Sequence, residues 1–323
     1  MEKAIATQQL VHALELHSQG KFQDAVDVYL QILETNDDEV VRNNYGFLLL
    51  QRSELQKAME QFDRALAFNA RYAPALCNRG LVFWTENRPD DAIGSFMKAL
   101  EIEPDDLQIN INLAQLFTVT GRYAEAEDLW QKVLSLEPDS RHLSAYVEVL
   151  LAGKRFAEAE QVLQLNNSWV EQNAKLLSFR GLISFMQYNY GEAISFFRKA
   201  LGIEPENCDI RGQLANVLLK CDEKAAACLE FKRILMLEPE QNNIRNNLAV
   251  LELSDGEVDQ ALVNFNIVLQ NDPNDSKALY YKGILLLQQG NKDEARTCLL
   301  TVLENENADY KKESEQALAS ISE

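Results

Sequence analysis

The residues best suited to acid–base or metal chemistry are the three histidines, His12, His17 and His142. Two histidines share a metal on one helix face when they stand four residues apart, whereas His12 and His17 stand five apart. His142 is distant from both along the chain. The spacing therefore predicts ordinary, partly exposed helix residues and neither a catalytic site nor a metal site.

The cysteines show no paired spacing, which argues against a disulfide framework and against a Cys-X-X-Cys redox site. They are Cys77, Cys208, Cys221, Cys228 and Cys298. An odd number of unpaired thiols favours reduced cysteines and a cytoplasmic protein. Cys221 and Cys228 stand seven residues apart, but a turn is expected to separate them.

Acidic turns are the remaining candidates for ion binding. The segment Asn271-Asp272-Pro273-Asn274-Asp275 carries the oxygen ligands that calcium prefers. It lacks the central glycine and the distal glutamate of a calcium loop, and similar turns recur along the chain. The sequence also lacks a glycine-rich phosphate loop and a nucleophile elbow. We therefore expect a non-enzymatic protein with no metal and no cofactor.

The elements that carry these residues repeat at a nearly constant interval. Alanines stand 33 or 34 residues apart at Ala25, Ala58, Ala92, Ala126, Ala159, Ala193, Ala227, Ala261 and Ala295. Twelve positions before most of them stands a small residue, such as Gly46 or Gly80, and four positions after stands a large one, such as Phe62 or Phe96. Such a period is typical of one supersecondary unit stacked on itself.

Each unit is predicted to be a helix, a tight turn, a second helix and another tight turn. Apolar residues at i, i+4, i+7 and i+8 from each alanine form one stripe of an amphipathic second helix. The small residue lies on the first helix, where a missing side chain lets two helix axes approach closely. Proline ends the second helix, as at Pro104 and Pro273, and the acidic and amide residues beside it are suited to cap the next helix.

The residues that recur at fixed positions of each unit resemble the tetratricopeptide repeat. The segments Gly-Arg-Tyr-Ala-Glu-Ala at 121–126 and Leu-Glu-Pro-Asp at 136–139 are similar to its consensus. The resemblance implies an all-α, right-handed superhelical solenoid of helix-turn-helix repeats. We expect four repeats at 6–139, a degenerate fifth at 140–173, four more at 174–309, and a short C-terminal capping helix at 310–323.

The fifth repeat departs from the pattern at three positions. Asn166-Asn167 replace its apolar pair, Glu171 replaces its turn proline, and Val147 occupies the small-residue position. Its second helix is expected to end near Leu165. Because the phase of the repeat is kept, we interpret the segment as a bend rather than a domain boundary. In the capping helix, the residues expected to cover the last repeat are Tyr310, Ala317, Leu318 and Ile321.

The chain is strongly acidic, with a net charge of −19. This charge would repel phosphate backbones, so we expect no nucleic-acid partner. No apolar run approaches the length of a membrane span, and residues 1–10 lack the pattern of a secretory signal, so we expect no membrane insertion. The acidic residues either keep outward helix faces soluble or attract a basic partner.

By the family resemblance, the first helix of each repeat lines the inner, concave surface. Asn44, Asn78 and Asn112 then occupy one inward position in consecutive repeats, 34 residues apart, and should form a ladder. A primary amide offers a donor and an acceptor, which matches the backbone of an extended peptide. Family members that hold extended peptides use asparagines here. The asparagines could instead serve only the fold, and both interpretations stay open.

A second polar set resembles, in part, the clamp with which family members bind the C-terminal carboxylate of chaperone tails. Asn216, Asn247 and Lys277 have the matching spacing of 31 and 30 residues. Gly212 and Tyr281 stand where two further cations are expected. Because two of the three cations are missing, the charge-assisted grip on a carboxylate is mostly lost, and we do not expect a chaperone-tail clamp.

Much of the remaining inner surface is predicted to be apolar, which is typical of a protein-binding surface. Its proposed aromatic anchors are Trp84, Phe185, Tyr280 and Tyr281. The leading prediction is a non-enzymatic scaffold or adaptor that binds a basic or apolar peptide or helix of a partner in its concave groove. The alternatives are a self-assembling structural protein, hence a homo-oligomer, and a regulatory or substrate-presenting subunit of a larger complex.

Overall fold

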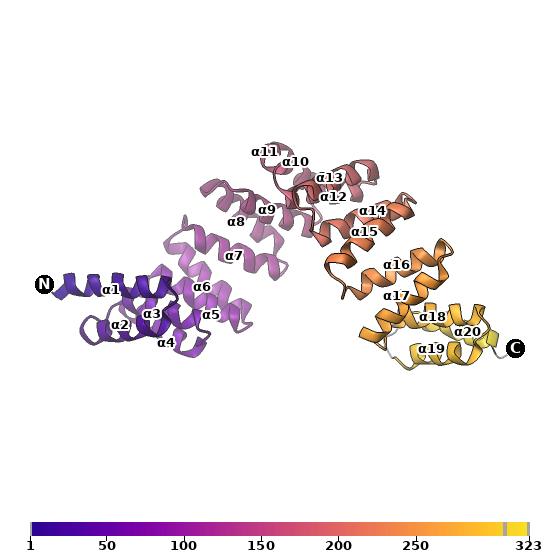
Figure 1. The fold of residues 1–323 in the computed structure, drawn as a ribbon. Helices are drawn as coiled ribbons and strands as arrows, with labels where there is room; N and C mark the ends of the chain where they lie inside the picture. The colour runs from indigo at the N-terminus through magenta and orange to yellow at the C-terminus, as the bar shows by residue number, and fades with distance from the viewer. Residues whose placement is uncertain (1, 306–308, 322–323) are drawn as a thin grey trace. The chain divides into compact units, whose positions relative to one another are not determined.

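The computed structural model describes residues 2–305 and 309–321, and the side chains of residues 7–305 and 309–320. Within these residues the chain forms twenty α-helices and no strand, stacked in chain order within each of two compact units (Figure 1). The units are Met1–Val162 and Leu163–Glu323. The predicted all-α repeat solenoid is therefore confirmed, and the division between the units falls inside the fifth repeat.

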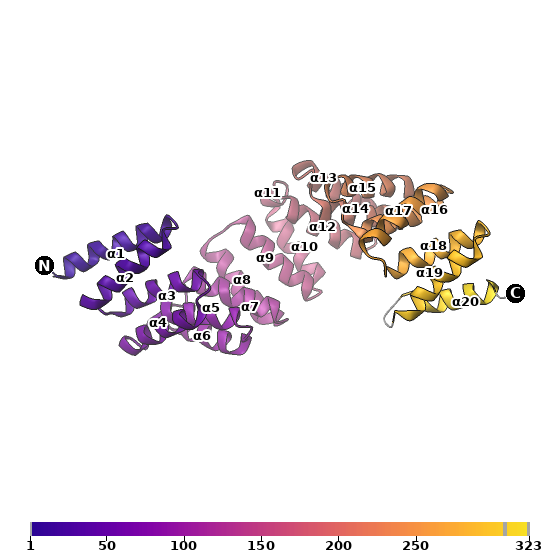
Figure 2. The ribbon, with the colours of Figure 1, turned by 60° about the horizontal axis from the view of Figure 1, so that its bottom comes forward.

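The first unit consists of repeated helix pairs. Its first helices are α1 (Glu2–Ser18), α3 (Glu39–Gln51), α5 (Ala73–Thr85), α7 (Leu107–Val119) and α9 (Ser140–Ala152). Its second helices are α2 (Phe22–Thr35), α4 (Leu55–Phe68), α6 (Pro89–Ile102), α8 (Tyr123–Leu136) and α10 (Phe156–Leu165), the last of which runs into the second unit at Leu163. Each of α2, α4, α6 and α8 packs on its own first helix and on the next one, which makes the stack continuous (Figure 2).

The second unit follows the same plan. It begins with the single-turn helix α11 (Asn167–Val170), which the sequence pattern does not predict. Its first helices are α12 (Ala174–Met186), α14 (Cys208–Lys220), α16 (Asn242–Ser254) and α18 (Ser276–Gln288), and its second helices are α13 (Tyr190–Ile203), α15 (Lys224–Leu237), α17 (Val258–Asn271) and α19 (Lys292–Glu304). A final helix, α20 (Lys311–Ile321), packs on α19.

The core is built from the residues that recur in every repeat. All nine alanines of the 33–34-residue series are fully buried. The large residue of each second helix fills the space left by the small residue of the first: a Cβ added to Gly46 would stand 2.6 Å from Phe62 Cε1, and one added to Gly80 would stand 2.6 Å from Phe96 Cε1. In these two repeats a side chain at the glycine position would collide with the phenylalanine that fills the gap between the two helices.

The turn between the two helices of each repeat contains one residue with a positive φ, five positions before the alanine. These residues are Gly20, Ser53, Asn87, Gly121, Lys154, Tyr188, Asp222, Gly256 and Gly290. Each ends its helix by the same bonding, as when Asn87 N donates to Trp84 O and Arg88 N donates to Phe83 O, both at 2.9 Å. Because only four of the nine are glycines, this recurring turn position cannot be recognised from residue type.

The turn between repeats contains the proline and the predicted caps. α6 ends at Ile102, two residues before Pro104. Asp106 Oδ1 accepts a hydrogen bond from Ile109 N at 2.8 Å, and Asp275 Oδ1 accepts one from Ala278 N at 2.8 Å. The expected capping of α7 and α18 is confirmed, and so is the end of α10 at Leu165.

Candidate functional site

The first-helix face of the first unit contains a hollow of 440 Å³ between α3, α5 and α7. Its lining is Asn43, Asn44, Phe47, Cys77, Asn78, Leu81, Gln108 and Asn112. Five of these side chains are primary amides and none is charged. The structure therefore brings the three asparagines of the predicted ladder, Asn44, Asn78 and Asn112, to one site, which we call the amide hollow.

Asn112 is the buried member of the set, with 4% of its surface exposed. Its Oδ1 accepts a hydrogen bond from Gln108 Nε2 at 2.8 Å, and its Nδ2 donates to Cys77 Sγ at 3.4 Å. Burial raises the pKa of the Cys77 thiol to about 11, so the sulfur stays protonated and unreactive. Both ends of the Asn112 amide are occupied by the protein, and this residue serves the packing of α5 against α7.

Asn44 and Asn78 are half-buried and keep unused hydrogen-bonding groups. Asn78 Nδ2 donates to Asn43 Oδ1 at 2.9 Å, which ties α5 to α3. Across the residues that the structure describes, no group donates to Asn78 Oδ1, and the Asn44 amide has no hydrogen-bond partner. Asn112 is thus fully hydrogen-bonded within the protein, whereas Asn44 and Asn78 keep open hydrogen-bonding groups.

Trp84 lies on the same face, six residues beyond Asn78 on α5. It lines a second hollow of 340 Å³ with Trp130 of α8 and residues of α7 and α9, among them the well-exposed Val119. Trp130 Nε1 donates to Thr118 Oγ1 at 3.5 Å. Because both hollows use one face of α5 and one face of α7, an extended ligand at the amide hollow would continue past Trp84.

The polar set predicted in the second unit is only partly brought together. Lys277 Nζ donates to Asn247 Oδ1 at 2.8 Å, and both line a hollow of 570 Å³. Burial lowers the pKa of Lys277. Asp272, Asp275 and Asp309 line the same hollow, so its carboxylates outnumber its cation, and it is poorly suited to a carboxylate ligand.

Asn216 and the aromatic candidates of the second unit lie elsewhere. Asn216 is exposed on α14, outside that hollow. Tyr280 stacks on Tyr310 with ring centroids 5.0 Å apart, and Tyr281 stacks on Phe265 at 5.6 Å. Both tyrosines therefore pack at the end of the unit, next to Tyr310, which precedes α20.

The other residues singled out in the second unit are less constrained. Phe185 is half-buried, with its ring centroid 5.8 Å from that of Tyr190. Ala317 and Leu318 of α20 are half-buried, whereas the side chain of Ile321 lies outside the described residues.

The residues with potential for chemistry are dispersed. His17 Nε2 is 2.8 Å from Gln51 Oε1, His142 Nδ1 is 2.9 Å from Glu137 O, and His12 is exposed. Over residues 2–305 and 309–321, no three His, Cys, Asp or Glu side chains are grouped so that they could hold a metal ion. In the same ranges no helix is both long enough and apolar enough to cross a bilayer.

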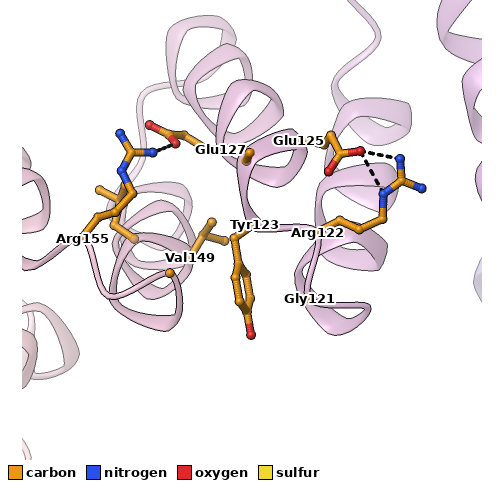
Figure 3. A pocket seen from close by; sticks show the side chains of 10 residues that line it. Gly121, Arg122, Tyr123, Glu125, Glu127, Val149 and Arg155 are labelled. Atoms are coloured by element: carbon orange, nitrogen blue, oxygen red, sulfur yellow. Dashed lines mark hydrogen bonds and ion pairs between the residues drawn. The ribbon is translucent and has the colours of Figure 1, made fainter.

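A further hollow of 410 Å³ lies at the turns of the fourth and fifth repeats (Figure 3). Arg122 Nε donates to Glu125 Oε1 at 2.9 Å, and Arg155 forms ion pairs with Glu127 and Glu158. Pairing with Arg122 lowers the pKa of Glu125, so the carboxylate stays ionised. The charged groups of this hollow neutralise one another, and it offers no acid–base pair.

Formal charge is distributed unevenly between the two helix sets of the first unit. Its five first helices carry four carboxylates and four cations. Its five second helices carry 13 carboxylates and four cations, a net charge of −9. The amide hollow therefore belongs to a neutral face, and the acidic residues of the unit's helices lie mainly on the second helices.

Comparison with known families agrees with this architecture. Models described as the tetratricopeptide repeat match residues 10–75, 83–145, 120–178, 184–251 and 252–313. The chain belongs to the tetratricopeptide repeat family. Each repeat of this family member is one pair of first and second helices, as assigned above.

Two curated relatives illustrate the breadth of the similarity. The chain is 30% identical over 180 residues to Protein POLLENLESS 3-LIKE 1 of Arabidopsis thaliana, covering 54% of this chain and 36% of the relative. It is 25% identical over 215 residues to the BBSome complex member BBS4 of Bos taurus, covering 64% of this chain and 40% of the relative. This tetratricopeptide repeat chain thus spans well under half the length of either relative.

A solved structure supports the same fold. A chain of the APC/C hetero-tetramer Cut9-Hcn1 matches with a TM-score of 0.52 and 18% identity, covering 82% of this chain and 52% of that one. At this identity the match shows the tetratricopeptide repeat fold alone.

Proposed function

We propose that this protein is a non-enzymatic interaction scaffold whose first unit binds an extended, uncharged peptide segment of a partner. The observation that carries the proposal is the amide hollow. In a chain of net charge −19, it is lined by five primary amides and no charged group. Unused amide groups match the alternating donors and acceptors of a peptide backbone.

The ligand contacts follow from the groups that remain open. Asn44 offers a complete amide and Asn78 offers Oδ1, so each can hydrogen-bond one peptide unit of the ligand. Phe47 and Leu81, which line the same hollow, would contact an apolar side chain between those units. Trp84 would contact the ligand further along α5, as an aromatic anchor of the interface.

A role as a subunit of a larger assembly is compatible with the same site. One relative is named as a member of the BBSome complex, and a partner subunit would present the bound segment. Five free cysteines favour a reducing, cytoplasmic setting for this role.

The test uses peptides selected for binding to the full chain from a randomised display library, with affinities then measured by calorimetry. Asn44→Ala and Asn78→Ala should each weaken a selected peptide about fivefold, which corresponds to about 1 kcal/mol for one neutral hydrogen bond. The matched control is Asn216→Ala, which removes an exposed asparagine from a first helix of the second unit. Equal affinities of wild type and the Asn44 and Asn78 variants would refute the proposal.

A further inference from the structure

The second helices of the first unit form a separate groove that the proposed function does not use. A hollow of 480 Å³ lies between α6 and α8, with α7 at its floor. The floor is made by the buried Leu113 and Phe117, and the walls by Met97 of α6 and Leu129 of α8. Met97 is 47% exposed, so an apolar surface faces solvent here.

The repeat does not require this apolar surface. One repeat earlier the position of Met97 is occupied by Asp63, and one repeat later by Gln131. The position of Leu129 is occupied by Ser95 in the preceding repeat and by Val162 in the following one. Since both neighbouring repeats fold with a polar residue at the position of Met97, packing between repeats does not explain Met97.

The rim of the groove is acidic. Arg122 pairs with Glu125, and its guanidinium lies 4.3 Å from the centroid of the Phe117 ring. This cation therefore does not neutralise the other carboxylates of the groove. Glu101 and Asp128 also line the groove, and among the described residues neither forms an ion pair. The groove thus combines an apolar floor with two unneutralised carboxylates, on the helix set that carries a net charge of −9.

We propose that this groove binds a basic amphipathic helix of a partner. An apolar side chain of that helix enters between Met97 and Leu129, where the flexible thioether adapts to its shape. Lysine or arginine side chains on either side pair with Glu101 and Asp128, and the acidic face steers the approach. The surface is independent of the amide hollow, which lies among the first helices.

The test is a methyl NMR titration of the full chain labelled at methionine, of which the sequence has five. The probes are three synthetic peptides of about 18 residues: a helix with one leucine face and one lysine face, its leucine/glutamate counterpart, and a serine/lysine counterpart. The leucine/lysine helix should shift the Met97 methyl signal, and the other two should not. Met236 is the internal control, because it is 80% exposed on α15 and reports non-specific contact.

Affinity of the leucine/lysine helix is then measured for two variants. Met97→Asp should raise its Kd at least tenfold, and the variant should fold because Asp63 occupies the same position one repeat earlier. The double change Glu101→Gln with Asp128→Asn should weaken binding severalfold and reduce its salt dependence. Asn44→Ala, which alters only the amide hollow, should leave the Kd unchanged.

Three results would overturn the proposal. The first is no shift of Met97 with the leucine/lysine helix. The second is an equal response to the serine/lysine peptide, which would show attraction by charge alone. The third is a concentration-dependent dimer, seen by light scattering, that Met97→Asp dissociates, since the groove would then be occupied by a second copy of this chain.

Discussion

The two units use the same repeat positions in different ways. In the first unit, Asn44 and Asn78 stand fourteen residues before their alanines and present open amide groups to a neutral hollow. In the last repeat of the second unit the same position is occupied by Tyr281, whose ring stacks on Phe265. The first helices also differ in charge, with four carboxylates and four cations in the first unit against two carboxylates and seven cations in the second.

This difference shows that a position within the repeat does not assign a function by itself. A polar residue at this position is open to a ligand only where its neighbours leave its hydrogen-bonding groups unused. At the end of the second unit, the rings of Tyr280 and Tyr281 are half-buried and pack against Tyr310. Binding should therefore be sensitive to the first unit and insensitive to the second.

The largest expected effect comes from truncating one large buried side chain in the core of either unit. Phe96 of α6 and Phe231 of α15 occupy the same column and are both buried. Phe96→Ala and Phe231→Ala should each lower the free energy of unfolding by about 3–5 kcal/mol, measured by urea denaturation. Only Phe96→Ala should also abolish binding of a selected peptide. Equal loss of binding in both variants would contradict separate roles for the units.

The aromatic contacts at the end of the second unit should contribute somewhat less. Tyr310→Ala removes ring contacts to Tyr280 and Tyr281 and should cost about 2 kcal/mol. Hydrogen exchange should speed up in α18 and α19, while peptide affinity stays at the wild-type value. A drop in affinity would show that Tyr280 and Tyr281 contribute to the ligand site after all.

The two kinds of asparagine in the amide hollow should separate in stability measurements. Asn112→Ala leaves the buried Cys77 without its partner, removes the bond to the exposed Gln108, and should cost about 1–2 kcal/mol. Asn44→Ala removes no hydrogen bond within the protein and should change stability by less than about 0.5 kcal/mol. Thermal melts of the two variants decide the point, and equal losses would indicate a purely structural ladder.

The smallest expected effect concerns the turn residues with positive φ. Lys154→Gly should stabilise the protein by about 1 kcal/mol, because a side chain with a Cβ is strained at its φ of 59°. Asp222→Gly, at a φ of 60°, should gain only a few tenths, since aspartate tolerates this region better. Urea denaturation of both variants checks the order, and destabilisation by Lys154→Gly would show that its side chain is needed in the turn.

The sequence predicts most of the fold because each column has one physical cause. The buried alanines, the glycines opposite Phe62 and Phe96, and the caps Asp106 and Asp275 are all identified by residue type and spacing. The helix α11 is not predicted, because it arises where the fifth repeat loses its apolar pair. The sequence also does not predict the turn position with positive φ, since residues with bulky side chains, such as Lys154 and Tyr188, occupy it in some repeats.

The candidate site is predicted less completely than the fold. Spacing brings Asn44, Asn78 and Asn112 to one face, but it does not distinguish the buried Asn112 from the other two. That distinction depends on two contacts of Asn112, one with Gln108 within α7 and one with Cys77 of the neighbouring α5. The groove at Met97 was detectable in the alignment of repeats, as an apolar residue where the neighbours have Asp63 and Gln131.

The most direct test of the account is a hydrogen-exchange footprint of the full chain with and without a selected peptide. If the first unit holds the ligand at the amide hollow, amide exchange should slow in α3, α5 and α7 and stay unchanged in α16 and α18. Protection confined to α16 and α18 would contradict the account and transfer the binding site to the second unit.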